Sequence, residues 1–190
     1  MRRLILILAA SLIGGCKRQS TMSAPISPKQ IPELRAWAEK GDARSQTVLG
    51  AAYLLGTGVP KDEVEAAKWF RKAAEQGDAD GHCTLGIFYA GGIGLPKDEA
   101  EAVKQIRQGA EQSHPESLAR LGAMYANGLG LPKDEVEAYK WFLLASKQGH
   151  KVAKARCVDL EHNLTPEQRA EGERRAREFK PAKAPAAARQ

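Results

Sequence analysis

Aromatic residues and cysteines are scarce in this sequence of 190 residues. Aromatic side chains make up 6% of the chain, and there are three cysteines. A small secreted domain held together by disulfides would need more cysteines than this. With few large rings, alanine and glycine must supply much of the packing, which favours closely stacked helices. The length is sufficient for one domain with a real hydrophobic core.

The body of the chain also lacks an excess of positive or negative charge. The formal net charge is +6, a value that by itself suggests a nucleic-acid partner. Seven basic residues, however, lie near the two ends: Arg2, Arg3, Lys17, Arg18, Lys180, Lys183 and Arg189. Without these seven, the 29 basic residues fall to 22 against 23 acidic ones. The body therefore lacks a basic footprint, and we expect no nucleic-acid partner.

The long apolar run of this sequence lies at its start. Residues 4–13 are apolar or small and follow Arg2 and Arg3. The run is shorter than the roughly 20 residues that cross a bilayer, and it is typical of a secretory signal. Small residues then lead to Cys16. We interpret residues 1–15 as a signal peptide and residues 16–27, which are polar and contain proline, as a flexible tether.

The string Ile13-Gly14-Gly15-Cys16 resembles the lipobox of bacterial lipoproteins, with Ile and Gly as permitted variants. The resemblance implies that Cys16 is acylated and becomes the first residue of a lipid-anchored protein. Lys17 stands where an aspartate would favour retention in the inner membrane of enterobacteria. This implies an outer-membrane location facing the periplasm. The alternative is an ordinary secretory signal in which Cys16 is incidental.

The body repeats itself with a period of 36 residues. Three segments align with one another without gaps: LGAAYLLGTGVPKDEVEAAKWFRKAAEQG, LGIFYAGGIGLPKDEAEAVKQIRQGAEQS and LGAMYANGLGLPKDEVEAYKWFLLASKQG. Each unit predicts two helices joined by a Gly-x-Gly turn with a proline that stops the first helix. Asp62, Asp98 and Asp134 are predicted to begin the second helices, with Glu65, Glu101 and Glu137 completing capping boxes. Gly50, Gly86 and Gly122 are predicted to allow a close approach between the paired helices.

These strings resemble the Sel-one-like repeat (SLR) family, which is related to the tetratricopeptide repeat. The resemblance implies an all-α, right-handed solenoid of stacked helix-turn-helix repeats that acts as an interaction scaffold. We assign the repeats to residues 43–78, 79–114 and 115–150, after a capping helix at 28–42. A degenerate helical cap is predicted at 151–179, with the last helix facing solvent, and a disordered tail at 180–190.

Signatures of catalysis and of cofactor binding were not found. The Gly-x-Gly turns lack the strand and the spacing of a phosphate-binding loop. The four histidines show no metal-ligand spacing: His82, His114, His150 and His162. Cys83 and Cys157 are in different repeats at different positions, so we expect two free thiols, with Cys157 buried. We therefore expect neither enzymatic activity, nor a cofactor, nor a metal.

In the tetratricopeptide relatives, the first helix of each repeat lines a concave binding face. Carried over, this implies a candidate partner-binding face made of Arg44, Thr47, Ala51, Asp80, Cys83, Ile87, Glu116, Ala119 and Ala123. The residues at these positions differ between units, while the packing positions repeat. Neutral drift on an unused face explains that variation equally well.

The sequence therefore predicts a membrane-anchored scaffold or adaptor that binds other envelope proteins or peptides. Two alternatives stay open. One is an envelope hydrolase acting on peptidoglycan or β-lactams, although the SxxK motif of β-lactamases does not occur. The other is a secreted factor that binds a host receptor.

Overall fold

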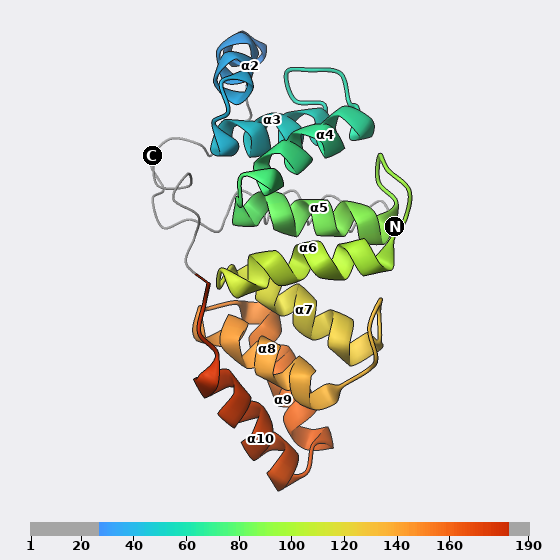
Figure 1. Ribbon diagram of the computed structural model, residues 1–190, viewed down its shortest axis with the longest axis vertical. Helices are drawn as coiled ribbons and strands as arrows, with labels where there is room; N and C mark the ends of the chain where they lie inside the picture. The colour runs from blue at the N-terminus through green and yellow to red at the C-terminus, as the bar shows by residue number, and fades with distance from the viewer. Residues whose placement is uncertain (1–26, 183–190) are drawn as a thin grey trace.

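A computed structural model describes residues 27–182, and this part of the chain contains helices and no strands. The helices stack along the long axis of the molecule, from α2 at one end to α9 and α10 at the other (Figure 1). The fold is an all-α solenoid, as predicted. The element bounds are η1 (Pro28–Gln30), α2 (Ile31–Glu39), α3 (Ala43–Leu55), α4 (Glu63–Glu75), α5 (Ala79–Gly91), α6 (Glu99–Glu111), α7 (Pro115–Asn127), α8 (Glu135–Lys147), α9 (Lys151–Asn163) and α10 (Pro166–Glu178).

Close approach within each helix pair depends on a glycine in the first helix. A Cβ atom at Gly50 would lie 3.1 Å from the Phe70 ring, and one at Gly86 would lie 2.7 Å from Cγ1 of Ile106. The third pair repeats this arrangement with Gly122 against Phe142. The predicted reason for these glycines is therefore confirmed: they make room for a buried side chain of the second helix.

The second helices begin at aspartates, as predicted, but the capping boxes do not form. The Asp62 carboxylate accepts a hydrogen bond from the backbone N–H of Glu65 at 2.9 Å. The backbone N–H of Asp62 donates to the carbonyl of Tyr53 at 2.9 Å, so it is not free for Glu65. The Glu65 side chain pairs with Lys68 instead. Asp98 and Asp134 donate in the same way to Tyr89 and Tyr125.

The last helix does not face solvent on all sides, contrary to the prediction. Helix α10 packs against α8, because Gly172 leaves room for the Tyr139 ring. At the end of α10, the Phe179 ring meets Trp141 edge to face, with centroids 5.4 Å apart. The chain then returns to α6, where the Ala182 N–H donates to the Glu111 carbonyl. Residues 166–182, the C-terminal arm, therefore cover α8, the second helix of the third repeat.

Within residues 27–182, none of the helices combines the length and the apolar character that a membrane crossing requires. Cys16, the proposed tether up to residue 26 and the tail from residue 183 lie outside the described residues.

Candidate protein-binding face

The nine residues predicted to face a partner differ widely in exposure. Arg44 and Asp80 are exposed on the first turns of α3 and α5. Ala51, Ile87 and Ala123 are half-buried at equivalent positions of three helices. Thr47 and Glu116 are also half-buried, and both contact the N-cap residue of a following helix, Asp78 of α5 and His150 of α9.

Cys83 and Ala119 do not belong to an exposed face. Cys83 is 1% exposed and Ala119 is 7% exposed, and both are part of the largest hydrophobic cluster. That cluster also contains residues of α6, α8 and α9. The prediction that Cys83 and Ala119 contact a partner is therefore wrong, because both side chains are buried in the core.

Three polar contacts join the start of a first helix to the N-cap residue of α5, α7 or α9, which is also the last residue of the same repeat. The Thr47 hydroxyl donates to the Asp78 carboxylate at 3.0 Å. His114 Nε2 lies 3.0 Å from Oδ1 of Asp80, and His150 Nε2 lies 3.0 Å from Oε2 of Glu116. Each contact therefore links the start of α3, α5 or α7 to the start of the helix two positions further along the chain, α5, α7 or α9.

Both histidines of this row also stand at helix N-termini. The backbone N–H of Ala153 donates to His150 Nδ1 at 3.1 Å. His114 differs, because burial opposes its charged form but the hydrogen bonds with Asp80 and Cys83 outweigh burial and raise its pKa to about 10. His114 Nδ1 lies 2.9 Å from the Ser117 hydroxyl and 3.4 Å from the Ser117 backbone nitrogen. His114 thus links the Asp80 carboxylate to the first turn of α7.

We expect the Glu116 carboxylate to make the stability of the solenoid depend on pH, with less stability at low pH. The hydrogen bond from His150 lowers the pKa of Glu116, and Arg120 adds to the effect. A lowered carboxyl pKa stabilises the fold at pH above about 4.5, and that stability is lost as pH falls through the folded-state pKa. Because the side chain is 31% exposed, we expect Glu116→Gln to lower the melting temperature at pH 7 by about 2–4 °C.

The difference between the wild type and Glu116→Gln should shrink towards pH 3, as measured by circular dichroism melts. Glu111→Gln is the matched control, since the Glu111 side chain makes no hydrogen bond or ion pair within residues 27–182. A pH-independent difference would show that Glu116 acts through packing rather than through its charge.

The two cysteines among the described residues are free and buried. Burial raises the pKa of the Cys157 thiol to about 11, so it stays protonated and a poor nucleophile at neutral pH. No group of three or more His, Cys, Asp or Glu side chains in residues 27–182 could hold a metal ion. Metal-dependent chemistry therefore has no candidate centre in this part of the chain.

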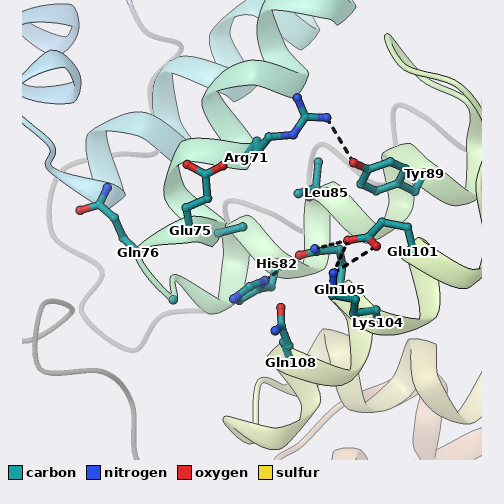
Figure 2. Close-up of a pocket in the computed structure, with 12 residues that line it drawn as sticks. Arg71, Glu75, Gln76, His82, Leu85, Tyr89, Glu101, Lys104, Gln105 and Gln108 are labelled. Carbon is teal, nitrogen blue, oxygen red and sulfur yellow. Dashed lines mark hydrogen bonds and ion pairs between the residues drawn. The ribbon is translucent and has the colours of Figure 1, made fainter.

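A hollow that the sequence did not predict lies between α4, α5 and α6. It has a volume of about 500 Å³ and is shown in Figure 2. His82 and Gln105 are its most deeply buried polar side chains, at 8% and 9% exposure. One feature of the sequence pointed to this hollow: Gln105 stands at the repeat position where the other two repeats have Trp69 and Trp141.

Comparison with known proteins identifies the repeat. A model of the Sel1 repeat matches residues 43–78, 79–114 and 115–150, which together span more than half of the chain. The chain belongs to the Sel1 repeat family. Sel1 repeats form protein-interaction scaffolds that are in general not catalytic.

Solved structures of other Sel1 repeat proteins resemble this one. The crystal structure of a Sel1 repeat protein from Oxalobacter formigenes is 35% identical, with a TM-score of 0.63 over 69% of this chain and 98% of its own. The protective antigen c5321 of uropathogenic Escherichia coli, which has an SLR fold, is 30% identical, with a TM-score of 0.76 over 97% of this chain and 39% of its own.

Helicobacter pylori cysteine-rich protein B has a TM-score of 0.54 at 22% identity, over 67% of this chain and 91% of its own, and shares the fold. A search of curated protein sequences finds no match.

Proposed function

We propose that this Sel1 repeat protein is a lipid-anchored scaffold that binds another protein in the bacterial cell envelope. The observation that carries the binding part is the stack of three Sel1 repeats with outward-facing first-helix residues, among which Arg44 is exposed and makes no ion pair within residues 27–182. The buried cysteines and the contacts of Asp80 with His114 and of Glu116 with His150 are explained by folding. Arg44, Ala51, Ile87 and Ala123 remain as candidate contact residues.

Support for export comes from the N-terminal sequence and from one relative. Residues 1–16 carry the charged, apolar and small-residue regions of a signal that ends at a cysteine. The relative c5321 is described as a protective antigen present in uropathogenic strains, which is compatible with export of this chain. Several acyl chains on Cys16 would anchor the protein firmly, because each buried CH₂ contributes about 0.8 kcal/mol. The absence of aspartate after Cys16 supports the outer membrane, facing the periplasm.

Cys16→Ser should abolish both acylation and membrane attachment. Cells fed an alkyne analogue of palmitate are expected to label the wild type, which then sediments with membranes. The Cys16→Ser variant should take up no label and keep its uncleaved leader. Cys83→Ala is the matched control, because Cys83 is buried in the solenoid and should leave labelling unchanged. An unlabelled wild-type protein released by ordinary signal cleavage would contradict the lipid anchor.

A further inference from the structure

Two of the three second helices carry a buried tryptophan at the same repeat position. Trp69 on α4 is 4% exposed and packs with Ala38 of α2 and Leu49 of α3. Trp141 on α8 is 7% exposed and is covered by Phe179. Helix α6 has Gln105 at the same repeat position, and the groove between α4 and α6 contains the hollow of about 500 Å³. The hollow therefore lies where the other repeats place an indole ring.

The floor of the hollow contains a hydrogen-bond acceptor without a donor. Gln105 Nε2 donates to the Glu101 carboxylate at 2.7 Å, and Gln105 Oε1 lies 2.8 Å from His82 Nδ1. Because an amide oxygen only accepts, His82 Nδ1 carries the proton and a neutral ring leaves Nε2 as an acceptor. Within residues 27–182, His82 Nε2 has no hydrogen-bond partner, and although the residue as a whole is 8% exposed, this nitrogen is not one of the fully buried unpaired atoms, so it is open to a ligand in the hollow.

The walls of the hollow suit a flat aromatic ring. Leu85 and Ala74 provide apolar surface, and Tyr89 stands at one side, where Arg71 donates to its hydroxyl (Figure 2). Lys104 occupies the repeat position of Lys140, whose ammonium group lies 4.2 Å from the centroid of the Trp141 ring. A ring in the hollow could therefore receive a cation contact like that of Trp141.

We propose that this hollow binds the side chain of a tryptophan presented by a partner protein. The indole N–H would donate to His82 Nε2, and the ring would cover Leu85 where the chain has no tryptophan of its own. The proposal rests on the proposed function of protein binding and adds a second contact surface, on α4 and α6 rather than on the first helices. Tryptophan suits such a site, since it combines a large apolar area with a single donor.

The test uses N-acetyl-L-tryptophanamide as a probe, titrated into the ¹⁵N-labelled protein with chemical shifts recorded by NMR. We expect saturable shifts at His82, Gln105 and their neighbours. N-acetyl-1-methyl-L-tryptophanamide, which lacks the indole N–H, should bind at least about fivefold more weakly because one hydrogen bond is lost. N-acetyl-L-leucinamide should cause no saturable shift.

Two variants connect the shifts to the hollow. Gln105→Trp should abolish binding and raise the melting temperature, because the protein's own ring then fills the groove as in the first and third repeats. His82→Leu should weaken binding at least about fivefold and stay folded, since Leu118 occupies the same position in the third repeat. Circular dichroism confirms that each variant is folded.

Several results would overturn the proposal. These are shifts that do not saturate, equal binding of the methylated probe, or unchanged binding by folded Gln105→Trp. Trp37 is 52% exposed, so dimerisation that Trp37→Ala abolishes would make a second copy of the chain the occupant instead. Failure of the probe would leave acylation of Cys16 and partner binding at Arg44 unaffected, so the two proposals can fail separately.

Discussion

Gly94→Ala should lower the melting temperature of the solenoid by about 4–20 °C, which corresponds to a loss of about 2–5 kcal/mol in a chain of this size. Gly94 has a φ of +66°, and an added Cβ would lie 2.0 Å from the Glu63 carbonyl oxygen and 2.8 Å from the Val64 nitrogen. Both atoms are backbone at the start of α4, so they cannot move without shifting the preceding repeat. Left-handed conformation costs about 1–2 kcal/mol for alanine, and overpacking adds about 1–3 kcal/mol.

The same turn provides the control for this experiment. Gly92 has a φ of +65°, but the nearest atom to an added Cβ is Cβ of Lys97 at 3.4 Å. Gly92→Ala should therefore show only the conformational cost of about 1–2 kcal/mol. The two variants are compared by thermal melts and by urea unfolding at one pH. Equal losses would mean that the turn does not pack tightly against the preceding repeat.

The difference in stability between Gly94→Ala and Gly92→Ala measures how much the packing of this turn against the preceding repeat stabilises the fold. At the following junction, a Cβ at Gly130 would lie 2.5 Å from the Glu99 carbonyl oxygen. The Gly-x-Gly turn therefore has two distinct tasks. Its first glycine ends the first helix, and its second glycine lets the turn rest against the backbone of the preceding second helix.

The 36-residue period was enough to predict the fold, because every repeat reuses the same packing. The position of Gly50 relative to Phe70 and that of Gly122 relative to Phe142 follow from one alignment of the sequence with itself. The aspartates that begin the second helices were predicted for the same reason. Local spacing was less informative about the capping boxes, since it does not show that the carbonyl of Tyr53 already occupies the N–H of Asp62.

Contacts between repeats explain what the sequence did not predict at the candidate face. Cys83 and Ala119 occupy a helix position that looks exposed on a single repeat. Their burial comes from the packing of α5 to α9 on one another, which is a property of the stack. The contacts of His114 with Asp80 and of His150 with Glu116 also depend on how successive helices are placed in space. The spacing of residues along the sequence does not determine that placement.

The hollow beside Gln105 and the path of α10 are departures from the repeat, so periodicity could not predict them. The loss of a tryptophan at Gln105 was visible in the alignment, but its consequence depends on whether another side chain fills the groove. At Trp141, a residue from outside the repeats, Phe179, packs on the ring. At Gln105, no equivalent side chain within residues 27–182 closes the hollow.

The proposed scaffold gives the exposed and the buried first-helix residues different roles. Asp80 and Glu116 hold the stack together, so their replacement would weaken the fold as well as any binding. Arg44 is free of such contacts within residues 27–182. It is therefore the position at which binding can be probed without disturbing the junctions between repeats.

Photo-crosslinking from Arg44 in living cells tests the binding function most directly. A benzophenone amino acid replaces Arg44 in one variant and Lys61, an exposed turn residue, in a matched control. After irradiation, we expect Arg44 to give a discrete higher-mass adduct in the membrane fraction, with an envelope protein identified by mass spectrometry, and Lys61 to give none. No adduct at Arg44, or the same mixture of adducts at both positions, would contradict a specific protein-binding face on the first helices.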